Sequence, residues 1–209
     1  SEDSIWYEKP AAKWMEALPV GNGHLGAMVF GNPTNERIQL NEDSMWPGAA
    51  DWENSKGTSK DLDEIRHLIK KGRIKEADRL IVDRFSYKSI VRSHQTMGDL
   101  FIDFEEKKNV KNYKRSLNLD DALVSVDYTS EGNTYSQKVF ASAIDDASVI
   151  ELSTDAKEGL NLKLRLNRPL DNGRETVTLS NPSEDEISMH GMVTQYGGMK
   201  NSKPFPIDY

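Results

Sequence analysis

Hydrophobic and polar residues alternate with a period of two along most of this chain, which predicts a protein built mainly from β-strands. In the run "LVSVDYTS", Val124, Val126 and Tyr128 fall on one face of a strand. The next residues, Glu-Gly-Asn at 131–133, predict a turn, after which the chain returns as a second strand. This segment therefore predicts a β-hairpin with one buried face.

Three further segments carry the same signal. "LFIDFE", 100–105, predicts a single strand, and we interpret "SVIELST", 148–154, and "LNLKLRLN", 160–167, as a strand pair. In the last of these, leucine at every second position alternates with asparagine and basic residues. One buried face and one wet face are typical of an antiparallel β-sandwich.

The period changes to that of a helix at Asp61, where apolar residues begin to recur every three or four positions. This pattern predicts two helices, over about 61–71 and 74–85, each with one apolar face that we expect to lie against a sheet. Asp61 and Glu64 predict a capping box, and Gly72 predicts the end of the first helix. The whole pattern predicts a mainly β fold: a large antiparallel β-sandwich with a short two-helix insertion.

The stretch "GNGHLG", 21–26, matches the glycine pattern that holds a dinucleotide pyrophosphate between a buried strand and a helix. That context is missing here. Pro19 disfavours a central parallel strand, and Gly-Asn-Pro at 31–33 interrupts any following helix within about a turn and a half. The residues favour a turn between two strands, 25–30 and 37–40, in which glycines permit a tight β connection.

The composition of the chain excludes some classes of partner but does not identify one. The chain has 209 residues, a formal net charge of −7 and no cysteine, which excludes disulfides and thiolate metal sites. No basic stripe stands out, and no apolar run approaches the ~20 residues of a membrane span. We therefore expect no nucleic-acid partner and no membrane insertion. A neutral ligand such as a sugar is compatible with this acidic chain, but acidity does not select for it.

The histidines carry no metal or catalytic signature by spacing alone. None of them lies at metal-ligand spacing from another, so we expect no metal site and no cofactor. The first predicted helix places His67 opposite its apolar residues, which indicates a solvent-exposed side chain. No Ser/His/Asp arrangement can be argued from spacing. The four histidines of the chain are His24, His67, His94 and His190.

The densest polar stretch of the chain is "QLNEDSMWPG", which contains our candidates for substrate binding: Asn41, Glu42, Asp43 and Trp46. A carboxamide, two carboxylates and an indole are the groups that sugar sites use, since polar groups bind hydroxyls and an aromatic plane covers the C–H face. Alternation along a strand predicts Asn41 and Asp43 on one face and Glu42 on the other.

A plainer interpretation of the same stretch remains open. Asp43 or Ser44 could cap a turn while Trp46 fills the hydrophobic core. Residue types alone favour this second interpretation, because tryptophan side chains are usually well buried.

The block "WMEALPVGNGHLGAMVFGNPTNERIQLNEDSMWPG", 14–48, closely resembles the N-terminal domain of glycoside hydrolase family 95, whose best-known members are α-L-fucosidases. Further matching stretches follow in the family's order, so the resemblance covers nearly the whole chain. They are "EIRHLIKKGRIKEADRLI", "HQTMGDLFIDF", "YKRSLNLDDALVSVDY" and "GNTYSQKVFASAIDD".

The resemblance implies a particular domain organisation. It assigns 1–209 to an N-terminal β-sandwich (a supersandwich) with a helical insertion at about 61–85, which packs on an (α/α)6 barrel. The closing run "GGMKNSKPFPIDY" carries no stop signal, and we expect the chain to be the front part of a larger protein. Catalytic groups of the family belong to the barrel, so the resemblance implies no catalytic residue here. Where this chain has His24, we expect arginine in many relatives.

The function implied by the resemblance is that of the non-catalytic N-terminal domain of an inverting, exo-acting α-L-fucosidase. Its partners would be its own C-terminal (α/α)6 barrel domain and a fucosylated glycan, in a periplasmic or extracellular setting and without a cofactor. The isolated chain would be inactive. Two alternatives stay open: a family member that acts on α-L-galactosides, and a free-standing carbohydrate-binding module.

Overall fold

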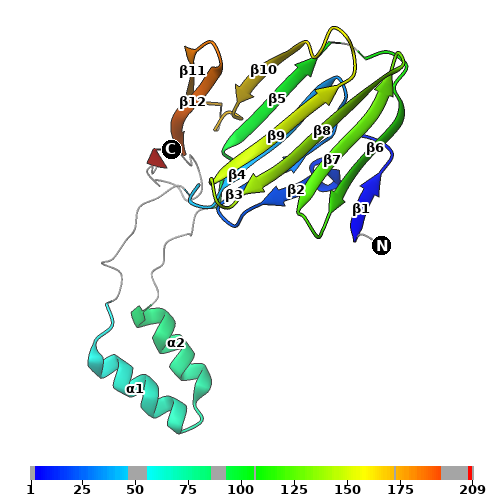
Figure 1. Cartoon of the computed structure of the whole chain (residues 1–209). Helices are drawn as coiled ribbons and strands as arrows, with labels where there is room; N and C mark the ends of the chain where they lie inside the picture. Colours follow the sequence, from blue (N-terminus) through cyan, green and yellow to red (C-terminus); the bar gives the residue numbers. More distant parts are fainter. Residues whose placement is uncertain are drawn as a thin grey trace. The chain divides into compact units, whose positions relative to one another are not determined.

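A computed structural model describes most of the chain. The described residues are 3–46, 56–85, 93–105, 107–171, 173–193 and 207–208. They belong to two compact units, one made of Ser1–Pro47 with His94–Tyr209 and the other of Gly48–Ser93. The first unit contains the β-strands and the second contains the two α-helices (Figure 1).

The strands of the first unit form three sheets, and every described strand pair is antiparallel. The sheet orders are β1-β6-β7-β8-β9, β10-β5-β4-β3-β2 and β11-β12-β13. The strands are β1 (Ser4–Tyr7), β2 (Leu18–Gly21), β3 (Leu25–Val29), β4 (Asn35–Glu42), β5 (Gly98–Phe104), β6 (Lys111–Asn118), β7 (Leu123–Ser130), β8 (Asn133–Ser142), β9 (Ala147–Thr154), β10 (Leu162–Asn167), β11 (Val177–Ser183), β12 (Glu186–Val193) and β13 (Ile207–Asp208); the 3-10 helix η1 (Trp14–Glu16) lies between β1 and β2.

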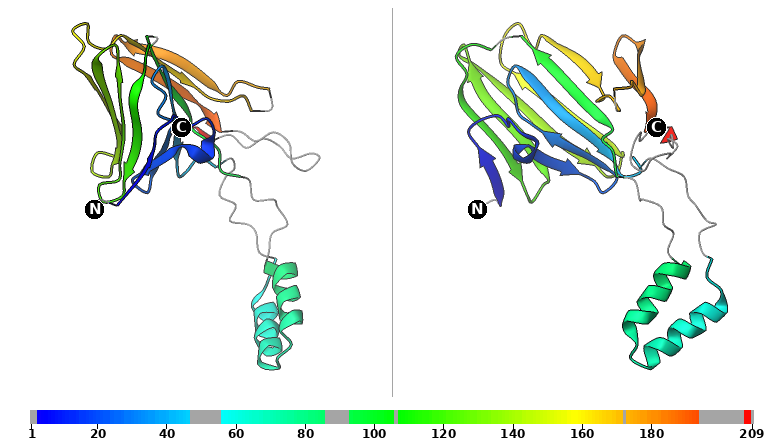
Figure 2. Two further views of the ribbon diagram at one scale, coloured as in Figure 1. Left: turned by 90° about the vertical axis from the view of Figure 1, so that its right-hand side faces the viewer. Right: turned by 180° about the vertical axis from the view of Figure 1, so that it is seen from behind.

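The two five-stranded sheets pack face to face as the layers of a sandwich (Figure 2). Their shared core contains Val29, Ile38 and Ile102 from one sheet and Val124 and Val139 from the other, all at most 1% exposed. Each such side chain stabilises the fold by about 1.5–3 kcal/mol relative to an exposed position. The predicted antiparallel β-sandwich is therefore confirmed.

The hairpin of β7 and β8 confirms the period-two interpretation. Val124, Val126 and Tyr128 are all buried in the core, as their alternation predicts. The turn residues Glu131 and Gly132 have φ angles of 51° and 84°. Two consecutive residues in the left-handed region are the geometry of a type I′ turn, whose twist matches that of the flanking strands.

The predicted pairing of 148–154 with 160–167 is wrong. The first segment is β9, which pairs with β8, and the second is β10, which pairs with β5 in the opposite sheet. Alternation identifies a strand and its buried face, but it does not identify the neighbouring strand. Because β10 lies at the edge of its sheet, Leu164 is 44% exposed, so the predicted buried face is incomplete.

The stretch "GNGHLG" forms the connection of the β2–β3 hairpin, which rules out the dinucleotide interpretation. Gly23 has a φ of 97°, a conformation that glycine adopts without strain. The side-chain oxygen of Asn22 accepts hydrogen bonds from the backbone N–H groups of His24 (2.9 Å) and Leu25 (2.7 Å). Since β2 is an edge strand, it also tolerates Pro19.

Helices α1 (Ser59–Lys70) and α2 (Ile74–Phe85) confirm the predicted helical insertion. Their apolar faces pack on each other, so the pair has a small core of its own; the expected contact with a sheet stays a prediction. Exposed His67 agrees with the helical pattern. Among the described residues, no helix is long and apolar enough to cross a membrane. The helical core contains Ile65, Leu68 and Ala77, with Leu80 and Phe85 partly buried against them.

The cap of α1 lies three residues earlier than predicted. Thr58 is the N-cap: its hydroxyl accepts from the Asp61 backbone N–H (3.3 Å), and the Asp61 carboxylate accepts from the Thr58 backbone N–H (2.8 Å). The predicted box of Asp61 with Glu64 is wrong, because a threonine hydroxyl precedes it at the correct spacing. Gly72, with a φ of 73°, follows the end of the helix as predicted.

Candidate functional site

The polar stretch singled out in the sequence lies where β4 ends. The strands predicted at 25–30 and 37–40 are β3 and β4, and they pair with each other. Along β4, Ile38 and Leu40 face the core while Gln39 and Asn41 face outward. The loop that follows carries the remaining candidates, and every group described below belongs to the sandwich unit.

Asn41 borders an open groove on the outer face of β2, β3 and β4. Its cross-strand partner is Gly26, where an added Cβ would lie 3.9 Å from the Asn41 Cβ. Because Gly26 has no side chain, the floor of the groove beside Asn41 stays open. The groove is lined by Trp14, Pro19, Val20, Gly26, Ala27, Met28, Gln39, Asn41, His94, Gln95 and Thr96.

Trp14 provides an exposed aromatic surface in this groove. Its side chain is half exposed, and its indole N–H donates a hydrogen bond to the side-chain oxygen of Gln39. The indole is thus held by β4 while an apolar ring surface faces solvent. The groove therefore combines a fixed aromatic ring with the carboxamide of Asn41.

Trp46 contacts His94 of the groove and does not lie in the core. It is 44% exposed, its indole N–H donates to the Asp43 carbonyl (3.0 Å), and its ring meets His94 edge to face at 5.2 Å. The alternative in which Trp46 fills the core is therefore wrong. The buried residue of this loop is Met45, 1% exposed, whose carbonyl accepts from the Gln95 backbone N–H (2.8 Å).

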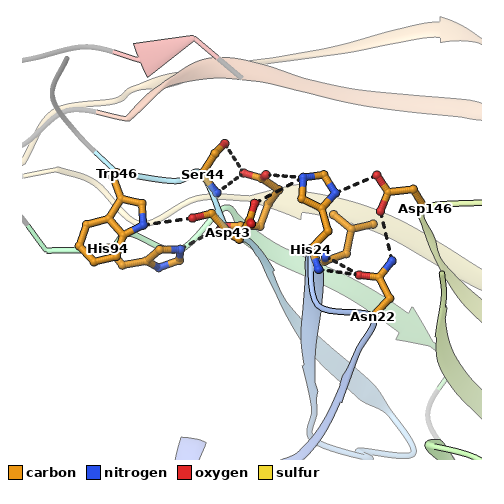
Figure 3. Close-up of polar contacts among 9 residues, drawn as sticks. Asn22, His24, Asp43, Ser44, Trp46, His94 and Asp146 are labelled. Carbon is orange, nitrogen blue, oxygen red and sulfur yellow. Dashed lines mark hydrogen bonds and ion pairs between the residues drawn. The ribbon is translucent and has the colours of Figure 1, made fainter. Parts of the chain in front are cut away.

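Glu42 and Asp43 meet at His24. Figure 3 shows His24 between Asp43 and Asp146. The His24 Nε2 lies 2.8 Å from Glu42 Oε1 and 3.4 Å from Asp43 Oδ1, and its Nδ1 lies 2.8 Å from Asp146 Oδ2. Asn41 and Glu42 lie on opposite faces of β4, as alternation predicts. The prediction for Asp43 is wrong, because β4 ends at Glu42 and the chain turns before Asp43.

Neighbouring groups fix the outer oxygens of two of these carboxylates. Ser44 donates to Glu42 Oε2 from its backbone N–H (3.0 Å) and from its hydroxyl (2.7 Å). The amide of Asn22 donates to Asp146 Oδ1 (3.1 Å) and to the Ser142 carbonyl (2.9 Å). The remaining oxygens, Glu42 Oε1 and Asp146 Oδ2, face the imidazole.

The electrostatics of this cluster favour the charged forms. The hydrogen bond with Asp146 raises the pKa of His24, against a smaller opposing effect of burial. The same bond, followed by that from Asn22, lowers the pKa of Asp146. Burial alone would raise the pKa of Glu42, but the hydrogen bonds from Ser44 and the charge of His24 lower it. Hydrogen bonds, supported by ion pairing with His24, therefore keep Glu42 and Asp146 ionised.

Comparison with known proteins decides the class of this domain. Residues 5–205 match the family described as "Glycosyl hydrolase family 65, N-terminal domain". The chain belongs to this family. The resemblance to the N-terminal domain of a glycoside hydrolase is thereby confirmed, while membership of family 95 in particular stays a prediction.

Curated relatives of this glycosyl hydrolase N-terminal domain are named as fucosidases. Alpha-L-fucosidase 2 of Arabidopsis thaliana is 31% identical over 186 residues, which are 87% of this chain and 21% of the relative. Probable alpha-fucosidase A is 30% identical in Aspergillus niger and 29% in Aspergillus oryzae, over 164 residues each, or 73% and 74% of this chain and 20% and 22% of those proteins. The chain thus spans about a fifth of their length.

Several groups of the site in this glycosyl hydrolase domain were not predicted from its sequence. His24 had a usable signal, since the predicted pairing of two strands after "GNGHLG" brings residue 24 beside residues 42 and 43. Asp146 had none, because it lies 122 residues from His24 in a turn of the opposite sheet. Trp14 and His94 reach the groove from segments with no periodicity of their own.

Proposed function

We propose that this chain is the N-terminal, non-catalytic domain of an inverting, exo-acting α-L-fucosidase that removes terminal fucose from glycans. In this proposal the groove beside Asn41 forms part of the glycan-binding surface. Support comes from the glycoside hydrolase family match and from relatives named as fucosidases. The C-terminal (α/α)6 barrel and a periplasmic or extracellular location belong to the proposal and come from the sequence resemblance.

The exposed carboxamide of Asn41, beside a fixed indole, carries the proposal. No hydrogen bond among the described residues involves this side chain, which leaves both its donor and its acceptor for a ligand. An amide suits a sugar because each hydroxyl can both donate and accept a hydrogen bond. Trp14, half exposed, offers the apolar ring that covers the C–H face of a pyranose.

The carboxylates around His24 are unsuited to acid catalysis, which supports a non-catalytic role. Inverting hydrolysis needs a protonated carboxyl group on one side of the sugar and a carboxylate base on the other, about 6.5–9.5 Å apart. A general acid requires a raised pKa, whereas ion pairs and hydrogen bonds lower the pKa of Glu42 and Asp146. In our proposal the acid and the base come from the barrel.

The groove is also compatible with a second candidate function. A free-standing carbohydrate-binding module would use the same exposed Trp14 and Asn41 without any partner domain. Hydrolysis of α-L-galactosides by the full-length protein is a variant of the first proposal, and the barrel would decide it.

The test is Asn41→Ala in the full-length protein, with kcat/KM measured on an aryl α-L-fucoside and on the matching α-L-galactoside. Loss of hydrogen bonds to the sugar should lower kcat/KM by about 10-fold. Asn181→Ala, at an exposed asparagine of β11, is the matched control and should leave kcat/KM unchanged. Unchanged kinetics in Asn41→Ala would refute the proposed role of the groove. Activity on the α-L-galactoside alone would change the proposed substrate to an α-L-galactoside and would leave the proposed role of the groove unchanged.

A further inference from the structure

We propose that His24, Glu42 and Asp43 form a binding site for one divalent transition-metal ion of the zinc type. The His24 imidazole and the two carboxylates each offer one ligand atom, and these three atoms lie within 4.8 Å of one another. Histidine spacing in the sequence could not reveal such a site, because two of the three ligands are carboxylates. The hairpin of β3 and β4 brings them together.

The two distances from His24 Nε2 to the carboxylate ligand atoms fit a metal ion. Bonds from zinc to nitrogen and oxygen ligands are about 2.0–2.1 Å long, so neighbouring ligand atoms lie about 2.9 Å apart at octahedral angles and about 3.3 Å apart at tetrahedral angles. The His24 Nε2 lies 2.8 Å from Glu42 Oε1 and 3.4 Å from Asp43 Oδ1. A metal ion could therefore bind between His24 and each carboxylate at its ordinary bond lengths, and the exposed Asp43 side chain is free to adjust to it.

Surrounding groups orient two of the ligands. Asp146 accepts at 2.8 Å from His24 Nδ1, which keeps a proton on Nδ1, so that a metal ion can displace the Nε2 proton and bind the Nε2 lone pair between the two carboxylates. A carboxylate on the far nitrogen is the usual support of a metal-bound histidine. Ser44 holds Glu42 by Oε2 and leaves Oε1 facing the imidazole. Each of these two side chains is thus fixed through an atom that the metal does not need.

The chemical type of the ligand atoms and their exposure to solvent indicate which ion would bind. One imidazole and two carboxylates suit zinc and similar transition metals better than Mg²⁺ or Ca²⁺, which prefer oxygen ligands only. The His24 side chain is 49% exposed and that of Asp43 is 62% exposed, so the remaining coordination positions would face water. We therefore expect reversible binding that ties the β2–β3 turn to the loop carrying Trp46.

The test is calorimetric titration of the full-length protein with ZnCl₂, after treatment with a chelator and with no sugar present. One zinc site should be lost in His24→Arg, because a guanidinium keeps a positive charge among the carboxylates but has no free lone pair. Asp146→Asn should weaken binding about 10- to 100-fold by loosening the imidazole. His67→Ala, at an exposed histidine of α1, is the matched control and should not change it.

Two further measurements keep the proposal independent of folding and of sugar binding. Asp43→Asn, at a side chain already 62% exposed, should weaken zinc binding even if His24→Arg is unstable. Zinc should also shift the NMR resonance of the His24 Nε2 nitrogen in the unmodified protein. Absence of zinc binding at millimolar concentration, or full binding by both His24→Arg and Asp43→Asn, would overturn the proposal. Neither result would affect the role proposed for Asn41.

Discussion

Two glutamates on the same face of β4, at its opposite ends, behave in opposite ways. Glu36 is fully buried, and burial raises its pKa to about 7 although the Gly31 and Phe30 backbone N–H groups donate to its Oε1 at 2.9 and 3.1 Å. Glu42 lies at the rim of the sandwich, where Ser44 and His24 lower its pKa. Desolvation therefore decides the pKa of a carboxyl group that the two sheets enclose, whereas hydrogen bonds and ion pairs decide it at the exposed rim of the sandwich.

This contrast bears directly on catalysis. The raised pKa of Glu36 would suit a general acid, but its side chain has no exposure to a substrate. Glu42 is partly exposed, but its pKa is lowered. Neither end of β4 therefore combines access to a substrate with the protonated state that a general acid requires.

The largest expected effect concerns hydrolysis by the isolated chain, which lacks a suitable general acid on β4. The isolated 209-residue chain should hydrolyse an aryl α-L-fucoside at least about 10⁶-fold more slowly than the full-length protein, because positioned acid, base and water supply most of the rate. Side-by-side assays at equal molar concentration would measure this difference. Clear turnover by the isolated chain, in a preparation free of other glycosidases, would contradict the proposed division of roles.

The next effect concerns stability against pH. Because the folded pKa of Glu36 lies near 7 and its ordinary value is 4.5, the native state binds more protons between these values. The contribution of Glu36 to the free energy of unfolding is therefore fully present below about pH 4.5 and lost as pH rises through 7, a change of about 3 kcal/mol. Urea unfolding at several pH values would measure it.

Two variants sharpen this measurement. Glu36→Gln should make the fall in stability between pH 5 and 8 clearly shallower, because an amide does not titrate, whatever its effect on absolute stability. Glu42→Gln, at the other end of the same strand, should retain the fall in stability over that range. An equal slope in the wild-type protein and in Glu36→Gln would show that another group causes the dependence.

The smallest expected effect concerns Trp46, which follows the end of β4 at Glu42. Trp46→Ala in the full-length protein should lower kcat/KM on an aryl α-L-fucoside by about 10-fold, because the exposed indole packs against His94, which lines the proposed glycan groove. The free energy of unfolding should fall by less than about 1 kcal/mol, because the side chain is already 44% exposed. A lower melting temperature with unchanged kinetics would assign Trp46 a purely structural role.

Local pattern in the sequence determined much of this fold. The period of two identified β7 and β8 together with their turn, because alternation and an adjacent pair of left-handed turn residues are both local properties. The period of 3.6 identified α1 and α2 for the same reason. Pro19 and the interrupted segment after "GNGHLG" were enough to favour a β-hairpin over a nucleotide site, and the polar stretch at the end of β4 was located correctly.

Only the tertiary structure decided what those elements contact. β9 and β10 have the strand pattern that was predicted, yet they lie in different sheets, because strand partners depend on long-range packing. The meeting of His24 with Asp146 and the opposite behaviour of Glu36 and Glu42 also depend on distant segments, which set the local solvent exposure and charge. A residue's type and period fix the face on which it lies, whereas its environment is fixed by the chain that folds over that face.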